Sequence, residues 1–169
     1  MENNLVVQSN ELVLAAYTMT TKEKQLLLTC ISRIDSRPDA PNITKQTKFT
    51  VTVEEVAKIF YTDSTKKNAF RDLEQASNRL FDREVLIALE DNKTLRTRFV
   101  SGVLYDPNGE QITITFAEDV LPYLTQLKAN FTKYRLMEVS ELSSIHSMRL
   151  YELIVCWVGP VSYTHLTLP

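Results

Sequence analysis

The sequence predicts an α+β fold, because capped helices, one alternating strand and two hairpin turns follow one another along the chain. Capping boxes at Thr20–Glu23 and Thr52–Glu55 supply a hydroxyl and a carboxylate for the free amides of a helix start. Apolar side chains alternate with threonines over 49–53, which indicates a half-buried strand. The segments 91–94 and 106–109 have the composition of tight turns.

Hydrophobic spacing predicts the remaining elements. Apolar residues recur at helical intervals in five segments, and four others are strand-like. The predicted helices cover 22–34, 52–60, 64–81, 120–127 and 145–157; the predicted strands cover 49–53, 84–90, 95–105 and 112–116; and 37–46 is a loop. The helix over 145–157 is apolar around most of its circumference, so we expect it to be buried or shared with a partner.

The composition is that of a globular protein, and a chain of this length is expected to form one domain or two small ones. Of 169 residues, 44% are hydrophobic and 24% charged, and no apolar run reaches the roughly 20 residues that span a bilayer. The first ten residues lack a secretory signal, so we expect a cytoplasmic protein. The net charge is −2, so a nucleic-acid partner would require basic residues gathered on one face. Cys30 and Cys156 are predicted to be small buried hydrophobes.

The order strand, short helix, turn, long helix and hairpin predicts a winged helix-turn-helix domain with additional helices. In that arrangement the helix over 52–60 braces the helix over 64–81. The longer helix then lays its outer face into a DNA major groove, while the hairpin reaches a neighbouring stretch of backbone.

The outer face of the long helix and the hairpin carry suitable side chains. Lysine and arginine neutralise phosphates, and Arg, Gln and Asn pair with base edges. The candidate DNA-binding residues are Lys66, Lys67, Asn68, Arg71, Gln75, Asn78, Arg79, Lys93, Arg96 and Arg98. Asp72 and Glu74 share the helix, however, so these residues alone favour DNA binding no more than an ordinary solvated face.

No catalytic or cofactor site is predicted. Histidine occurs only at His146 and His165, and the serines around His146 are helix neighbours on diverging faces without a third orienting group. The chain has three glycines in all and no phosphate-cradling loop. The acidic pairs Glu54–Glu55 and Glu118–Asp119 are typical of helix first turns and lack the His or Cys companions of a metal site. We therefore expect no enzyme, no metal and no cofactor.

The chain resembles the N-terminal winged-helix domain of iteron-binding plasmid replication initiators, the initiator replication protein family. The resemblance covers essentially Val6–Val158, and its RLYEL element is the most distinctive piece. The matching segments are VVQSNELVLAAYTMTTKEKQLLLTCISRI (Val6–Ile34), FTVTVEEVAKIF (Phe49–Phe60), AFRDLEQASNRLFDREV (Ala69–Val85), ITITFAEDVLPYLTQL (Ile112–Leu127) and FTKYRLMEVSELSSIHSMRLYELI (Phe131–Ile154).

The resemblance implies a protein that binds double-stranded DNA. In the family, monomers bind repeats at the plasmid origin and help to recruit the host replication helicase. Homodimers bind an operator and repress the initiator's own gene, which implies plasmid copy control. The first of two tandem winged-helix domains contributes dimerisation and DNA-backbone contacts.

The domain organisation predicted from the sequence is an N-terminal winged-helix domain over 1–160 and a foreign tail. Back-translated with common codons, 161–169 reads like the end of a transposase-type sequencing adaptor, so we expect a non-native read-through tail. The second winged-helix domain is accordingly expected to be absent.

Two alternatives stay open at this point. One is a single-domain winged-helix transcription regulator. A lone palindrome beside the gene would indicate such a regulator, whereas direct repeats indicate an initiator. The other is an oligomerisation module without DNA binding, whose charges only solvate the surface. Salt-dependent DNA binding separates this second alternative from both DNA-binding readings.

Overall fold

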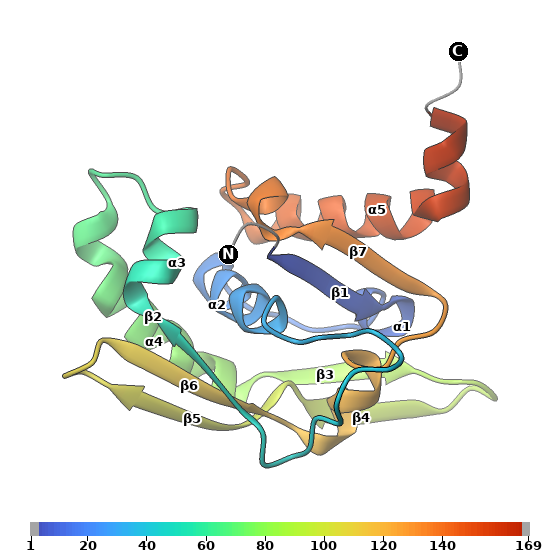
Figure 1. The fold of residues 1–169 in the computed structure, drawn as a ribbon, viewed down its shortest axis with the longest axis horizontal. Coiled ribbons are helices and arrows are strands. Elements are labelled where there is room, and N and C mark those ends of the chain that lie inside the picture. The colour runs from blue at the N-terminus through green and yellow to red at the C-terminus, as the bar shows by residue number, and fades with distance from the viewer. Residues whose placement is uncertain (1–3, 167–169) are drawn as a thin grey trace.

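The computed structural model describes the backbone of residues 4–166 and the side chains of residues 4–159. Helices and strands both contribute, so the α+β prediction is confirmed (Figure 1). In order, the elements are β1 (Leu5–Ser9), α1 (Asn10–Val13), α2 (Thr21–Ile31), β2 (Lys48–Thr52), α3 (Val53–Phe60), the 3-10 turn η1 (Lys66–Asn68), α4 (Ala69–Asp82), β3 (Glu84–Ala88), β4 (Thr94–Arg98), β5 (Val100–Asp106), β6 (Gln111–Phe116), the 3-10 helix η2 (Glu118–Tyr123), β7 (Phe131–Arg135), the 3-10 turn η3 (Leu136–Val139) and α5 (Ile145–Leu166).

The strands form three small antiparallel sheets. The first and last strands pair as β1–β7, the central sheet has the order β2–β6–β5, and β3–β4 is a separate hairpin. The helix α2 lies among these sheets, and nearly its whole length is buried (Figure 1). One core cluster joins α2 and α4 to all three sheets, so the described chain has a single hydrophobic core.

Both predicted capping boxes are confirmed. At the start of α2 the Thr20 hydroxyl accepts from the Glu23 amide at 3.3 Å, and the Glu23 carboxylate accepts from the Thr20 amide at 3.0 Å. Thr52 and Glu55 repeat the arrangement at α3, at 3.0 and 2.8 Å. These local bonds satisfy amides that a helix start otherwise leaves free, which is why sequence spacing located them.

The long helix begins later than predicted. The chain turns at 62–65, where Thr62 and Thr65 bond to each other, and forms η1 before α4 starts at Ala69. Ser64 is therefore part of the turn and does not cap the helix. The apolar stripe of α4 faces inward as expected, with Leu73 and Leu80 fully buried against α2 and β5.

One of the predicted strands follows a different course. The strand expected over 95–105 is broken at Phe99, which is 2% exposed and meets the Tyr17 ring edge-on at 5.2 Å. At this residue the chain leaves the β3–β4 hairpin and enters the central sheet. The hairpin turn itself is confirmed, because Asp91 and Asn92 have φ of 59° and 58°, the left-handed conformation that a two-residue turn needs.

The region after β6 was predicted to contain two helices and no strand, and this is wrong. The segment expected as a helix over 120–127 holds only the short η2, which contains Pro122 and ends at Tyr123. Phe131–Arg135 is the strand β7, which pairs with β1. The buried side chains of this strand are those of Thr132 and Tyr134. Because both carry hydroxyl groups, no alternation of apolar with polar residues marks the strand in the sequence.

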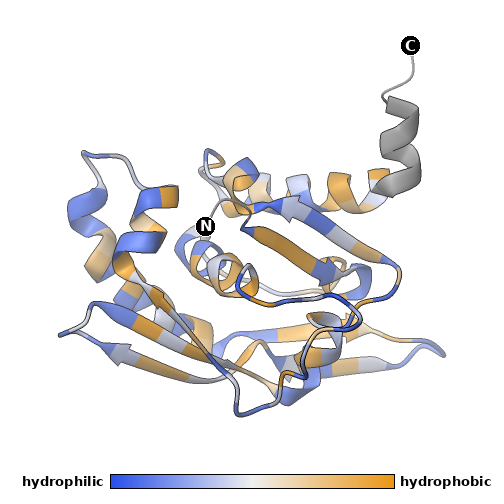
Figure 2. Ribbon diagram, viewed as in Figure 1, coloured by the Kyte–Doolittle hydropathy of each residue, from blue (hydrophilic) through white to orange (hydrophobic). Residues whose placement is uncertain are grey.

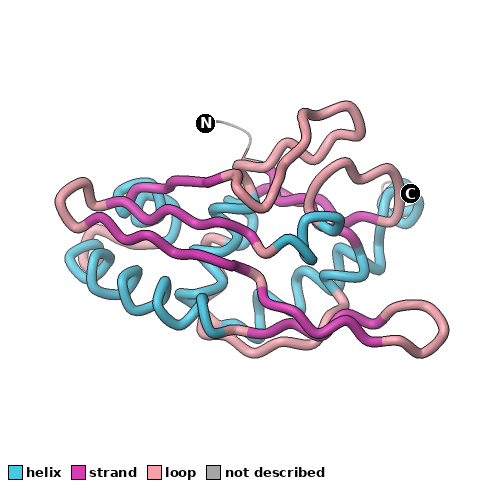
Figure 3. Tube along the Cα trace, turned by 90° about the horizontal axis from the view of Figure 1, so that it is seen from below, coloured by secondary structure: helices cyan, strands magenta, loops and turns pink. Residues whose placement is uncertain are grey.

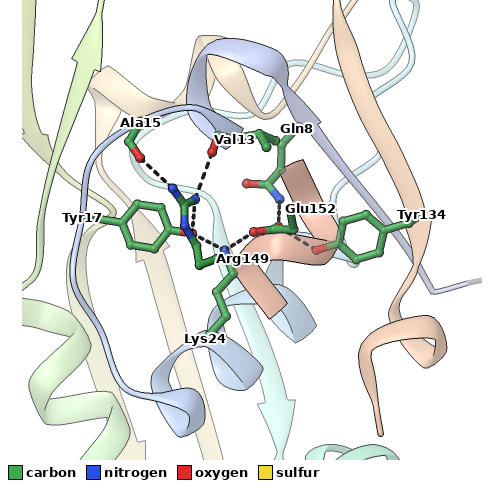
Figure 4. A network of polar contacts seen from close by, with 8 residues as sticks. All are labelled: Gln8, Val13, Ala15, Tyr17, Lys24, Tyr134, Arg149 and Glu152. Carbon is green, nitrogen blue, oxygen red and sulfur yellow. Dashed lines mark hydrogen bonds and ion pairs between the residues drawn. The ribbon is translucent and has the colours of Figure 1, made fainter. Parts of the chain in front are cut away.

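A buried polar network holds α5 against the domain (Figure 4). Glu152 forms an ion pair with Lys24 of α2 at 2.8 Å, with the two side chains 1% and 2% exposed. The same carboxylate accepts from the Tyr134 hydroxyl at 2.7 Å and from Gln8 Nε2 at 2.9 Å. Arg149 donates to the carbonyl of Val13 and to the hydroxyl of Tyr17. This inner face of α5 is therefore charged.

The helix α5 was expected to be buried or shared with a partner, and within the described chain only its inner face is buried. Met148 is fully buried, but Leu150 is 58% exposed. Gly159, with φ of 56°, interrupts the helical backbone, which continues to Leu166. The tail predicted over 161–169 lies outside the described side chains, and its last three residues lie outside the described backbone. Within the described chain, no helix is long and apolar enough to cross a membrane.

Candidate DNA-binding surface

The helix α4 presents one continuous polar face to solvent. Arg71, Gln75 and Asn78 are exposed and follow one another at four- and three-residue intervals, and the neighbouring Arg79 is exposed as well. Lys66 and Lys67 of η1 are exposed, and Asn68 is half-buried, just before the helix. Seven of the ten predicted site residues therefore lie together along α4 and the turn before it.

Packing from three neighbouring elements fixes the position of α4. The helix contacts α2, β5 and α3. At the end of α3, the Tyr61 hydroxyl donates to the Asp72 carboxylate at 3.0 Å. The ammonium group of Lys22 lies 3.9 Å from the centre of the Tyr61 ring, which adds a cation–π contact from α2. These contacts orient the exposed face without using its arginines.

Burial and hydrogen bonding change two pKa values at this junction. Burial raises the pKa of Tyr61, and the hydrogen bond to Asp72 raises it further. Burial lowers the pKa of Lys22, while the nearby Asp72 carboxylate opposes that shift. Tyr61 consequently stays protonated and keeps donating its hydrogen bond at neutral pH.

Sequence reasoning missed Lys22. With Thr20 it lines a small hollow of about 110 Å³ whose other wall includes Gln75 and Arg79 of α4. The polar face of α4 thus extends onto the start of α2. The spacing along the chain gives no sign of this, because Lys22 and Gln75 are 53 positions apart; only the packing of α2 on α4 brings them together.

The two arginines of the β3–β4 hairpin are engaged within the protein. Arg96 forms two hydrogen bonds with the Glu84 carboxylate, at 3.0 and 2.8 Å. Arg98 donates to the Phe81 carbonyl at 3.0 Å, at the C-terminal end of α4, where a cation is favoured. The charges of Arg96 and Arg98 are therefore partly compensated within the protein. For Lys66, Lys67 and Arg79, by contrast, no ion pair is found among the described residues.

The two hairpins lie at opposite ends of the molecule. Figures 1 and 3 show the β3–β4 turn, which carries Lys93, at one end of the long axis and the β5–β6 turn at the other, beside α3 and η1. The β5–β6 hairpin also continues the sheet that β2 begins. Its turn carries Asp106 and Glu110 and no basic residue. Lys93 is therefore distant from the lysines of η1, although both were predicted to belong to one surface.

The described residues show no metal-binding cluster, and one of the two cysteines is buried. Among residues 4–159, no group of three or more His, Cys, Asp or Glu side chains could hold a metal ion. Cys30 is buried, and burial raises the pKa of its thiol to about 12. This thiol is consequently protonated and packs as an apolar group, as predicted.

Three comparisons with known proteins bear on this fold. A family model described as "Initiator Replication protein, WH1" matches residues 5–155. A replication initiation protein of Escherichia coli is 29% identical over 162 residues, which cover 92% of this chain and 48% of the relative. The chain thus spans about half the length of the curated relative that it matches.

Two solved structures are similar to this chain. The Pi initiator protein, determined in complex with iteron DNA, superposes with a TM-score of 0.78 at 18% identity, covering 95% of this chain and 67% of that one. The WH1 domain of the replication protein MSBI1.176, isolated from a multiple sclerosis patient, has a TM-score of 0.43 at 21% identity, with 60% and 74% covered. The first likeness supports the winged-helix fold, and the second is too low to carry an argument. Because the family model matches most of its length, this chain belongs to the initiator replication protein family and contains the WH1 domain of that family.

Proposed function

We propose that this chain is the DNA-binding, self-associating part of a plasmid replication initiator. In this proposal α4 and η1 contact the repeats of a plasmid origin, the protein takes part in recruiting the host helicase, and a homodimer represses the initiator's own gene. The observation that carries it is the exposed basic and amide face of α4, held in place by α2 and α3. The Pi initiator, similar in fold, was determined with iteron DNA bound.

The start of α4 adds a physical reason to expect a phosphate there. No side chain caps this helix, and its first amide, that of Ala69, donates to the Lys66 carbonyl of the preceding 3-10 turn. Lys66 and Lys67 lie beside this helix start, where the helix dipole disfavours cations. A DNA phosphate at this point would neutralise the two lysines and would itself be favoured by the dipole.

The test is DNA binding by the purified chain as a function of salt. We expect the logarithm of affinity to fall linearly with the logarithm of salt concentration, and Arg71→Ala to reduce that slope by about one unit. The matched control is Arg96→Ala, whose guanidinium is paired with Glu84 and whose effect on the slope should be smaller. An unchanged slope in the Arg71 variant would remove this residue from the surface, and absence of salt-dependent binding would refute the proposal.

The DNA chosen for binding separates an initiator from a regulator. We expect tighter binding to direct repeats from the DNA beside the gene than to a scrambled sequence of equal length and composition. A preference for a single palindrome over direct repeats would instead identify a transcription regulator with the same fold.

A further inference from the structure

The outer face of α5 is an apolar stripe without a partner in the described chain. Leu150, Ile154 and Trp157 are 58%, 50% and 81% exposed. Their spacing of four and three residues places them in one line along the helix. Figure 2 shows this part of α5 largely in the colours of apolar residues. Single exposed apolar residues are ordinary, but an aligned row of large ones is typical of a contact surface.

The stripe is also free of charge. Between Leu150 and Gly159 the only charged residue is Glu152, and its carboxylate is 1% exposed on the opposite, inner face. The residues beside the stripe are apolar and half-buried: Leu153, Val155, Cys156 and Val158. Two copies of this surface can therefore meet without bringing like charges together.

We propose that α5 pairs antiparallel with α5 of a second copy of this chain, with Ile154 at the two-fold axis. This inference rests on the homodimer of the proposed function and names its contact surface. Leu150 lies four residues before the axis and Trp157 three residues after it, which is about one turn in each direction. In an antiparallel pair each leucine therefore faces the partner's indole ring, and the contact is self-complementary, as a two-fold interface requires.

The size of the stripe sets the expected strength. Three large side chains per copy bury less than the roughly 1,200 Å² at which stable interfaces begin. We therefore expect a reversible dimer with a dissociation constant in the micromolar range, on the order of 1–100 µM. Because α5 packs on β7 and α1 whereas α4 packs on α2, α3 and β5, pairing through α5 leaves both copies of the α4 face open (Figure 1).

Sedimentation of the whole chain across the micromolar range tests the proposal. Trp157 is the only tryptophan, so its fluorescence reports directly on this surface. We expect a monomer–dimer equilibrium, with tryptophan emission moving to shorter wavelength as dimer forms. Ile154→Glu should weaken association by about 100-fold or more, because it places two carboxylates at the axis. The matched control is Leu104→Glu on β5, an equally exposed leucine at 64%, which should leave association unchanged.

A cross-link tests the register. In a Cys156→Ser background, where the other thiol, Cys30, is buried, Ile154→Cys should give a covalent dimer with a short bifunctional maleimide. Cys at Leu150 alone should cross-link poorly, but mixed with a chain carrying Trp157→Cys it should cross-link well. A chain that stays monomeric, a dimer insensitive to Ile154→Glu, or aggregates of undefined size would each overturn the proposal.

Failure of this inference can be told apart from failure of the proposed function. Salt-dependent binding to a single repeat is measured at nanomolar protein, where the chain is monomeric, and Ile154→Glu should not change it. Loss of association with DNA binding intact refutes only the α5 pair. An intact dimer without DNA binding refutes the function of α4 and leaves the pair standing.

Discussion

The helices α4 and α5 differ in which face is buried: α4 buries its apolar face, whereas α5 buries a charged face and exposes an apolar one. In α4, Leu73 and Leu80 are buried and Arg71 and Arg79 are exposed, which is the ordinary amphipathic arrangement. In α5 the inner face carries Arg149 and Glu152, while leucine, isoleucine and tryptophan side chains face solvent. A charged group faces inward when the fold supplies partners for it, and an aligned row of large apolar side chains on the outside is typical of a contact surface.

The two arrangements have different energetic consequences. A buried ion pair contributes little net stability, but removing one of its partners leaves an uncompensated charge. Exposed ion pairs such as Arg71 with Asp72, at 3.6 Å, contribute little in either case. The inner face of α5 should therefore be sensitive to single substitutions, and the outer face of α4 should tolerate them without loss of stability.

The largest expected effect is that of Glu152→Gln. It leaves Lys24 charged and buried, so the free energy of unfolding should fall by about 3–5 kcal/mol. Urea denaturation followed by circular dichroism measures it, with Glu74→Gln on the exposed side of α4 as the control. In the double variant Lys24→Met/Glu152→Leu most of the loss should be recovered. A loss below about 1 kcal/mol for Glu152→Gln would mean that the pair is not the anchor of α5.

Adjacent residues of α5 should respond differently to the same change. Tyr151 is half-buried and meets the Tyr134 ring edge-on at 5.5 Å, so Tyr151→Asp should lower the free energy of unfolding by about 2 kcal/mol. Leu150→Asp should cost less than about 0.5 kcal/mol, since the side chain is mostly exposed, and should affect only self-association. The comparison is made by thermal denaturation at low protein concentration; equal losses would contradict the assignment of the two faces.

Acid should loosen α5 in particular. Burial alone would raise the pKa of Glu152, but the ion pair with Lys24 and the hydrogen bonds from Tyr134 and Gln8 outweigh it, so the pKa is lowered. A carboxylate with a lowered folded-state pKa stabilises above its unfolded pKa, about 4.3, and that contribution is lost as pH falls through the folded value. Unfolding measured from pH 7 to pH 3 should show this decline, and the decline should be shallower in Lys24→Met/Glu152→Leu.

The smallest expected effect on stability is that of substituting the exposed arginines. Arg79→Ala should weaken DNA binding and lower the salt slope by about one unit, without changing the free energy of unfolding by more than about 0.5 kcal/mol. Glu84→Gln should slightly strengthen DNA binding by releasing Arg96. Titration of fluorescent DNA at several salt concentrations measures both; a stability loss in the Arg79 variant would show that its side chain is structural.

Local features of the sequence predicted local structure well. The capping boxes of α2 and α3, the stripe of α4 and the two hairpin turns depend on residues three or four positions apart, so spacing alone revealed them. The seven candidate residues of α4 and η1 were predicted to share one surface for the same reason, because they lie close together in the sequence. Their role as DNA contacts stays a prediction, because the structure places their side chains and not their ligand.

Other features were decided by contacts between distant segments. The sequence by itself determined that α2, α3, α4 and α5 form and which face of α4 is polar. Only the tertiary structure decided that β7 pairs with β1, that Lys22 joins the α4 surface, and that the two hairpins lie at opposite ends. It also decided the orientation of α5, because Glu152 is stable inside only where Lys24, Tyr134 and Gln8 converge on it from three other elements. Hydrophobic periodicity cannot predict that Glu152 is buried, because a buried charge depends on partners far away in the chain.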